Sequence, residues 1–341
     1  MKRLIYRLSS MGDVILSQSA LEVPYSGTTD WVTLSEFKAL LENHPRLSRV
    51  WTFDRKKEGL REWIRLNSRL TELGYDEVLD LHSSYRTRVA YWVFRAHAWF
   101  AGKRMPTWKR LRKARWRRWG YLIFKRAWPA DWRPRALRRS CARLAGGTGV
   151  ERPNLRHLIG EPPETLRADP LPEPYYVVMP ASAWPGKQWP VAYYSEFVRK
   201  FGDGLAVIAG TAKDEASNEL VRRLRKENAV HRDAVGKFDL KQTAWLLARA
   251  RFLIANDTGL SHLAEAVGTP VIAFYGPTRW DFGFGISDPK SKALESDVWC
   301  SPCSKDGTLC YRLTNRFACL KSMTPSRAIE VARAVEAETG R

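Results

Sequence analysis

The sequence is poor in acidic side chains and has no long apolar run. Its 341 residues contain 57 Lys and Arg against 36 Asp and Glu, which gives a formal net charge of +21. This excess predicts anionic partners, such as a phosphorylated substrate, an acidic membrane face or a nucleic acid. No stretch approaches the roughly 20 apolar residues of a membrane span, and the N-terminus lacks the apolar run and cleavage site of a signal peptide. We therefore expect a cytoplasmic protein.

Several nucleotide-binding signatures are also absent. The sequence has no Asp-x-Asp pair, so nothing in it suggests a metal ion held against a nucleotide diphosphate. It has neither the G-x-G-x-x-G fingerprint of dinucleotide-binding folds nor the G-x-x-x-x-G-K-[ST] loop of the P-loop enzymes. If the protein binds a nucleotide, we expect it to do so without these devices.

Cysteine is scarce, with five residues in the chain, but four of them lie close together in sequence. Their spacing is C-x2-C-x6-C-x8-C, and one C-x2-C pair with two further thiols can complete a tetrahedral zinc site. Reduced thiols or a labile disulfide are the alternatives for a cytosolic protein. The candidate residues for a structural zinc are Cys300, Cys303, Cys310 and Cys319.

Positive charge is concentrated in residues 95–143. This segment has 17 Lys or Arg and one acidic residue, a net charge of +16, together with six of the 15 tryptophans. Tryptophan interleaved with basic residues is typical of a membrane interface, where aromatic rings lie at headgroup level and cations meet lipid phosphates. The alternative is a solvated basic helix whose tryptophans pack on the domain. A helix over residues 108–124 would place on one face Trp108, Leu111, Trp119 and Leu122.

Strand and helix patterns alternate in two blocks. In the first block, residues 2–8, 49–53 and 76–82 are predicted strands, and residues 60–74 are a predicted helix. In the second, strands are predicted at 175–181, 205–211, 252–255 and 270–275, with helices at 191–202, 239–250 and 324–340. Such alternation predicts an α/β protein with parallel sheets. Thr324 is the expected N-cap of the last helix, with Pro325 at its first position.

A proline-rich stretch separates the two blocks. Residues 160–174 contain five prolines and no periodic pattern, as expected of a linker. We therefore expect an N-terminal domain over residues 1–160 that includes the basic segment 95–143, a linker at 161–174 and a second domain at 175–322. The helix within residues 323–341 is expected to pack back on the first domain.

Polar turns that contain glycine follow four of the predicted strands. In open parallel sheets, ligands bind beyond the carboxyl ends of the strands. Gly12 and Asp13 follow the first strand, where Asp13 either caps a helix or takes a proton from a hydroxyl group. Ser182 and Lys187 follow strand 175–181, where a lysine is either exposed or contacts a phosphate.

The other two strand ends have the same character. After strand 205–211, Asp214 or its neighbour Glu215 either caps the next helix or binds ribose hydroxyls. After strand 252–255 comes "NDTGLSHLAEA", in which backbone N–H groups at a helix N-terminus, beside a glycine, suit a diphosphate. The alternative is an Asp or Thr cap with a packed histidine. The residues concerned are Asp257, Thr258, Gly259 and His262.

With these segments in view, the chain resembles the ADP-heptose:lipopolysaccharide heptosyltransferases, which are family 9 glycosyltransferases. The resemblance is carried by "LIYRLSSMGDVILSQSALE", "DEVLDLHSSYRTR", "PASAWPGKQWP" and "NDTGLSHLAEAVGTPVIAFYGPT". The "CSPC" segment and the closing "MTPSRAIEVARAV" also fit, and the basic segment is the least matched part. The resemblance implies the GT-B architecture, in which two Rossmann-like domains with parallel sheets face a central cleft.

The resemblance also implies an activity and roles for individual residues. The reaction would be an inverting, metal-independent transfer, with no cofactor required, from ADP-L-glycero-D-manno-heptose to the lipopolysaccharide inner core. The acceptor would be Kdo or heptose, met at the anionic cytoplasmic membrane face. Asp13 would be the general base, and Lys187 would contact the donor phosphates. The donor site would comprise Ser182, Asp214, Asp257, Thr258, Gly259 and His262, and the acceptor site Ser10, Gly12, Arg86 and Arg88.

Two alternatives stay open at the level of sequence. The same fold and motifs are compatible with a transferase that uses another nucleotide sugar. A catalytically silent basic protein that binds anionic lipid or nucleic acid is the second alternative, and the polar strand ends, which suit a small ligand, argue against it.

Overall fold

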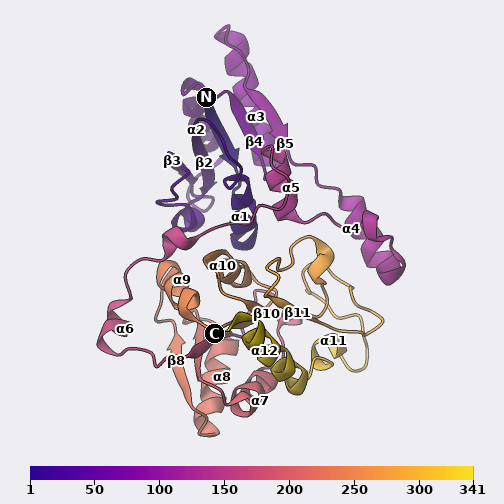
Figure 1. Cartoon of the computed structure of the whole chain (residues 1–341). Coiled ribbons are helices and arrows are strands. Elements are labelled where there is room, and N and C mark those ends of the chain that lie inside the picture. The colour runs from indigo at the N-terminus through magenta and orange to yellow at the C-terminus, as the bar shows by residue number, and fades with distance from the viewer. Residues whose placement is uncertain (341) are drawn as a thin grey trace. The chain divides into compact units, whose positions relative to one another are not determined.

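Each half of the chain folds around its own parallel sheet in the computed structural model, which describes residues 1–340 (Figure 1). The contacts divide the chain into two units. The first unit comprises Met1–Ala114 and Leu137–His157, and the second comprises Arg115–Ala136 and residues 158–340. The predicted α/β class with parallel sheets is confirmed.

The first sheet has five strands in the order β3-β2-β1-β4-β5, all parallel. Leu4 and Tyr6 alternate with Arg3 and Ile5 along β1, so both faces of the sheet are covered. Helices α2 and α3 pack together over the face that holds Leu4 and Tyr6, while α1 packs with α5. The strands are β1 (Lys2–Tyr6), β2 (Thr28–Leu34), β3 (Arg49–Phe53), β4 (Glu77–Asp80) and β5 (Thr107–Arg110), and the helices are α1 (Met11–Ser17), α2 (Leu60–Glu72), α3 (Tyr85–Phe100) and α5 (Leu137–Leu144).

The second sheet has six parallel strands in the order β11-β10-β9-β6-β7-β8. Its strands are β6 (Tyr175–Met179), β7 (Leu205–Gly210), β8 (His231–Val235), β9 (Leu253–Asn256), β10 (Val271–Tyr275) and β11 (Lys292–Glu295). Its helices are α4 (Arg115–Phe124), α6 (Glu164–Ala168), α7 (Val191–Phe201), α8 (Glu215–Lys226), α9 (Leu240–Arg249), α10 (Gly259–Val267), α11 (Ala318–Lys321) and α12 (Pro325–Thr339). Residues of α7, α8 and α12 share one core cluster with β6, β7, β9 and β10.

The last helix begins as expected, but it packs elsewhere. The Thr324 side chain accepts a hydrogen bond from the Arg327 N–H, and Pro325 occupies the first helical position. However, Ala328, Ala332 and Val335 of α12 lie in the core of the second unit. The expectation that this helix packs back on the first domain was therefore wrong, because its apolar face is already covered by α7 and the second sheet.

The basic segment 95–143 also departs from expectation. Residues 115–136 pack with the second unit, although the whole segment was assigned to the N-terminal domain. The continuous helix expected over residues 108–124 does not form. Trp108 lies in β5 and packs against Tyr6 and Tyr91 of the first unit, so strand pairing overrides the helical spacing there. The predicted linker joins the second unit and contains α6.

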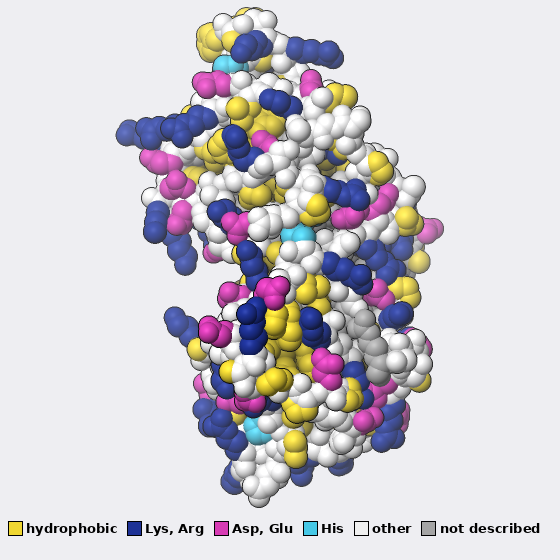
Figure 2. Space-filling model, turned by 60° about the vertical axis from the view of Figure 1, so that its left-hand side comes forward, with side chains coloured by type: hydrophobic (Ala, Val, Ile, Leu, Met, Phe, Trp, Pro, Cys, Tyr) yellow, Lys and Arg dark blue, Asp and Glu magenta, His cyan; other side chains and the backbone are white. Residues whose placement is uncertain are grey.

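The surface reflects the composition of the chain. Lys and Arg side chains are spread over the face drawn in Figure 2, with acidic groups and apolar areas between them. Among residues 1–340, no helix combines the length and apolarity needed to cross a membrane.

One buried side chain joins the two neighbouring strands at the centre of the second sheet. Asn256, at the end of β9, donates from Nδ2 to the Pro180 carbonyl just beyond β6, at 2.6 Å. Its Oδ1 accepts from the Trp189 N–H at 2.9 Å and from the Tyr194 hydroxyl at 3.2 Å. Asn256 is fully buried, so these groups have no water to replace it. It therefore fixes the loops that follow β6 and β9.

Replacing Asn256 with Leu is expected to lower the free energy of unfolding of the second unit by about 2–4 kcal/mol, because buried partners lose their hydrogen bonds. Tyr194→Phe removes one of these bonds and is expected to cost about 1 kcal/mol. Urea unfolding followed by tryptophan fluorescence measures both. Equal unfolding midpoints for Asn256→Leu and the wild type would contradict the role assigned to Asn256.

Candidate functional site

The candidate site of the first unit lies beyond β1 and β4, the neighbouring strands at which the strand order reverses. Such reversal points are where open parallel sheets form ligand sites, because the loops leave toward opposite faces. Arg7 and Asp13 follow β1, and His82 follows β4. The predicted base thus lies at the position in the sheet that suits a ligand.

Arg7 holds Asp13 in place. Its Nη2 lies 2.5 Å from Asp13 Oδ2, and its Nη1 donates to the Leu81 carbonyl beyond β4, also at 2.5 Å. The Arg7 side chain is 5% exposed and that of Asp13 is 24% exposed, so the carboxylate can still be reached from outside. The Ser10 N–H and hydroxyl also donate to Asp13 Oδ2. Asp13 therefore has the capping contact of the first interpretation and the accessibility that the second requires.

His82 lies among the same charges. Burial lowers the pKa of its imidazole to about 3, and the cations of Arg7, Lys113 and Arg86 add to this effect. Its Nδ1 is buried and has no hydrogen-bond partner among residues 1–340. The imidazole is therefore neutral at pH 7, which suits it to a hydrogen bond with a hydroxyl group.

The predicted acceptor residues fall into two groups. Ser10 is the N-cap of α1, and Gly12 lies in the first turn of that helix beside Asp13. Arg86 lies in the first turn of α3, close enough to influence His82 and with its guanidinium 5.8 Å from the Phe53 ring centre. Arg88 is exposed one half-turn further along α3. Ser10, Gly12 and Arg86 thus gather at the strand reversal, and Arg88 lies on the outer side of α3.

The candidate site of the second unit lies at the corresponding reversal, between β6 and β9. Lys187 comes from the turn Pro185–Lys187 after β6, and Asp257 directly follows β9. Lys187 Nζ lies 2.6 Å from Asp257 Oδ2, and both side chains are largely buried. The Thr278 hydroxyl, beyond β10, donates to the same oxygen at 3.1 Å. Sequence-distant residues are thus joined in one charged cluster.

The Lys187 turn rests on the backbone of the cysteine segment. A Cβ atom on Gly186 would lie 2.0 Å from the Gly307 carbonyl oxygen, so no larger residue fits there without movement. Gly307 itself has φ +72°, a conformation that favours glycine. The cysteine segment also bonds the turn after β10, where the Cys303 N–H donates to the Pro277 carbonyl at 3.0 Å. The cysteine segment therefore positions the turns that carry Lys187 and Thr278.

The N-terminus of α10 supplies the predicted anion-binding backbone. Thr258 is its N-cap in extended conformation, and its side chain makes no capping hydrogen bond. Gly259 is the first helical residue, and the first N–H groups of a helix have no partner within it. His262 is buried one turn further along. Thr258 and Gly259 thus lie directly beside Asp257, as the sequence predicted.

Ser182 and Asp214 are committed to local structure. The Ser182 hydroxyl accepts a hydrogen bond from the Trp184 N–H at 3.4 Å. Asp214 precedes α8, and its Oδ2 accepts from the Thr211 N–H at 2.7 Å, which closes the turn after β7. The alternative residue, Glu215, forms an ion pair with Arg222. Asp214 remains at a strand end, but its carboxylate already has a structural partner.

The four clustered cysteines line one small apolar pocket of about 100 Å³. They are free cysteines, and burial raises the pKa of Cys303 to about 11 and that of Cys319 to about 12. Within residues 1–340 no group of three or more His, Cys, Asp or Glu side chains is placed to hold a metal ion. The expected structural zinc site is therefore not confirmed.

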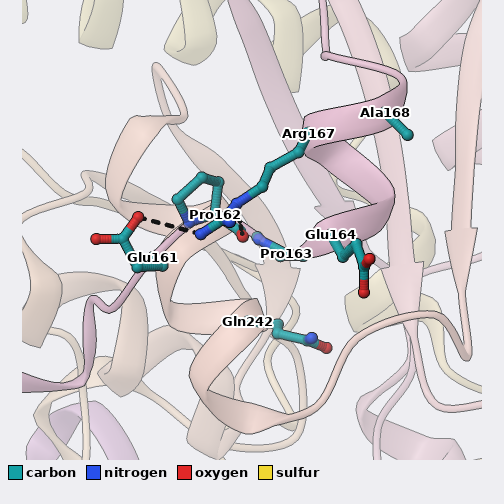
Figure 3. A pocket seen from close by; sticks show the side chains of 7 residues that line it. All are labelled: Glu161, Pro162, Pro163, Glu164, Arg167, Ala168 and Gln242. Carbon is teal, nitrogen blue, oxygen red and sulfur yellow. Dashed lines mark hydrogen bonds and ion pairs between the residues drawn. The ribbon is translucent and has the colours of Figure 1, made fainter.

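The largest pocket lies away from both strand reversals. It has a volume of about 730 Å³ and lies in the predicted linker, where Glu161 and Arg167 form an ion pair (Figure 3). Its lining residues are Glu161, Pro162, Pro163, Glu164, Arg167, Ala168 and Gln242. Prolines and one exposed ion pair offer no nucleophile, base or anion cradle, so we assign it no role.

Sequence reasoning missed four residues of these two clusters: Arg7, His82, Asn256 and Thr278. Three of them were readable in principle, because a polar side chain directly after a buried strand is the signal that identified Asp13 and Asp257. Thr278 gave no such signal, since only the fold brings the turn after β10 beside Asp257.

Comparisons with known proteins agree with these features. A family model described as glycosyltransferase family 9 (heptosyltransferase) matches residues 63–312. Over 323 residues the chain is 30% identical to lipopolysaccharide heptosyltransferase 1 of Pseudomonas aeruginosa, covering 89% of this chain and 86% of the relative. It is 29% identical over 314 residues to lipopolysaccharide heptosyltransferase 2 of Escherichia coli K12, covering 83% and 84%. The solved E. coli ADP-heptose lipopolysaccharide heptosyltransferase II matches with a TM-score of 0.70 and 25% identity over the full length of both chains.

The lowered pKa of His82 has a measurable consequence. We expect its NMR signal to stay that of a neutral imidazole from about pH 8 down to about pH 5. The unfolded chain binds this proton below about pH 6.5 and the folded chain does not, so stability falls as pH drops from there toward 3. Arg7→Met should raise the pKa, and Arg88→Met, a change outside the cations that act on His82, should not. A wild-type midpoint near pH 6.5 would contradict this assignment.

Proposed function

The chain belongs to glycosyltransferase family 9, the heptosyltransferases, and from this we propose that it transfers heptose from ADP-L-glycero-D-manno-heptose to the lipopolysaccharide inner core. The family assignment also identifies the fold as GT-B, with two Rossmann-like units, as the sequence predicted. The observation that carries the proposal is the pair of charged clusters, one at the strand reversal of each sheet: Arg7–Asp13 and Lys187–Asp257.

Asp13 is the general base of the proposed reaction. An acceptor hydroxyl gives its proton to the Asp13 carboxylate as its oxygen attacks the anomeric carbon of the heptose. A new carbon–oxygen bond forms on the face opposite the leaving group, and the bond to the diphosphate breaks, so the configuration inverts. Arg7 keeps the carboxylate oriented, and neutral His82 is placed to hydrogen-bond the acceptor.

Lys187 and the N-terminus of α10 bind the donor diphosphate. The free N–H groups after Thr258 and the helix dipole favour a phosphate at this position. Lys187 then stabilises the charge that develops as ADP leaves, without a metal ion. This use of Lys187 requires it to exchange Asp257 for phosphate oxygens, and the Thr278 hydroxyl remains as a partner for Asp257. Ser182, Asp214 and His262 complete the proposed donor site.

We place the reaction at the inner face of the cytoplasmic membrane, because the proposed acceptor is a glycolipid. The net charge of +21 supports peripheral contact with anionic lipid. Kdo and phosphate groups of the inner core would add negative charge that Arg86 and Arg88 are suited to bind.

Mass spectrometry of products tests the function directly. With ADP-heptose and Kdo- or heptose-terminated acceptors, the wild type should add one heptosyl residue, also in EDTA. Asp13→Asn should lower turnover by a factor of about 10²–10⁴ while ADP binding is kept, because it removes the base but not the cap. Asp239→Asn, at the N-cap of α9, is the matched control and should leave turnover unchanged.

Near wild-type turnover of Asp13→Asn would reject Asp13 as the base. Transfer from a UDP-sugar, with none from ADP-heptose, would instead favour the alternative in which the same fold uses another nucleotide sugar.

Lys187→Ala is expected to weaken ADP binding by about tenfold to a hundredfold and to lower turnover, because a charge-assisted contact to phosphate is lost. Lys213→Ala is the matched control, since Lys213 is an exposed lysine after β7 of the same unit. Isothermal titration calorimetry with ADP measures the difference. An ADP affinity of Lys187→Ala within twofold of the wild type would rule out the proposed phosphate contact.

A further inference from the structure

Helix α4 (Arg115–Phe124) turns apolar side chains toward solvent. Trp116, Trp119, Ile123 and Phe124 are 53%, 65%, 66% and 57% exposed. They occupy positions i, i+3, i+7 and i+8, so they form one stripe along the helix. A surface helix ordinarily buries such a stripe against its own domain, and here the stripe is uncovered.

The opposite side of α4 is firmly attached to the second unit. Tyr121 is 1% exposed, its hydroxyl donates to the Asp281 carboxylate at 2.8 Å, and its ring stacks on Phe282. Arg133 donates to the same carboxylate at 2.8 Å. The orientation of the helix is therefore set by specific contacts, and the outward direction of the stripe follows from them.

Further aromatic residues extend the stripe. Phe124, Trp128 and Trp132 are neighbours with ring centres 5.4 Å apart in each step, and Trp116 lies 5.9 Å from Trp132. Gly120 allows this packing, since a Cβ atom there would lie 2.3 Å from the Trp128 ring. Trp299 adjoins the group through Lys125, whose ammonium lies 4.9 Å from its ring centre. The aromatic face is defined here as Trp116, Trp119, Ile123, Phe124, Trp132 and Trp299.

Basic residues surround the aromatic face. Residues 115–136 contain seven Lys or Arg and one acidic residue, Asp131. Of the acidic side chains that meet the segment from the rest of the unit, Asp281 bonds Tyr121 and Arg133 beneath it, and Asp297 pairs with Arg126 at its edge. The segment keeps a positive excess after these pairs are counted.

We propose that the aromatic face docks on an anionic phospholipid bilayer. The tryptophan and isoleucine side chains would enter the headgroup region, while Lys and Arg around them contact lipid phosphates. Charge complementarity decides this occupant: a second copy of the chain would bring the same positive segment against itself, which costs electrostatic energy. The inference rests on the proposed function, whose acceptor is anchored in such a bilayer.

Sedimentation with vesicles tests the proposal. The full chain should bind vesicles of phosphatidylcholine with about 30% phosphatidylglycerol, and binding should fall as salt is raised. The double change Trp119→Ser with Ile123→Ser should weaken the partition coefficient by about tenfold or more, since two interfacial side chains are lost. Turnover on a soluble, delipidated acceptor should be unchanged, which shows that the variant is folded.

The matched control is Trp99→Ser, which removes an exposed tryptophan at the end of α3 in the first unit. We expect it to weaken vesicle binding less than the double change does. Wild-type binding by the double variant would overturn the aromatic face as the docking site. A self-association that only the double variant loses, without vesicle binding by the wild type, would also overturn it and assign the face to a second copy.

Failure of the proposed function looks different. In that case the wild type and all variants lack heptosyl transfer on the soluble acceptor, whatever their vesicle binding. Loss of wild-type vesicle binding with transfer intact would reject the docking site and leave the enzymatic proposal standing.

Discussion

The reversal of strand order inside each parallel sheet is the constraint on which both charged clusters depend. In each unit the chain begins its sheet near the centre, builds outward and then returns to pair on the other side of its first strand. The loops after the two central strands part there, so their ends lack a common covering element. One polar side chain bridges each gap: Arg7 reaches the Leu81 carbonyl, and Asn256 reaches the Pro180 carbonyl.

The two clusters share an electrostatic design. Each sets a carboxylate beside a cation in largely buried surroundings, because an unpaired charge there would be costly. The outcome differs with the cation's other contacts. Arg7 also bonds a main-chain carbonyl and is held in place, which leaves Asp13 as the reachable group. Lys187 has Asp257 as its charged partner, so an incoming anion can compete for it while Thr278 still serves Asp257.

Sequence reasoning located the fold class and most of both clusters, because strand ends next to glycine and polar residues are local signals. Strand 49–53 was predicted at its observed bounds, and Asp13, Lys187 and Asp257 were predicted as site residues. Strands β2 and β8 were missed, since Asp30, Arg232 and Asp233 interrupt their apolar pattern. The role of Thr278 and the contact of Gly186 with Gly307 depend on tertiary approach, which no local pattern encodes.

The basic segment shows how one pattern can carry two messages. Its tryptophan spacing was interpreted as a single helix, yet Trp108 pairs into β5 and contributes to the first core, whereas Trp119 on α4 contributes to no core. The same residue type therefore serves packing in one place and remains hydrated in the other. Hydrating an apolar stripe opposes folding, and the chain tolerates this cost because Tyr121, Phe282 and Asp281 secure the other side of α4. A stripe retained at such a cost, within a surplus of positive charge, is best explained by an anionic surface that covers it when the enzyme works.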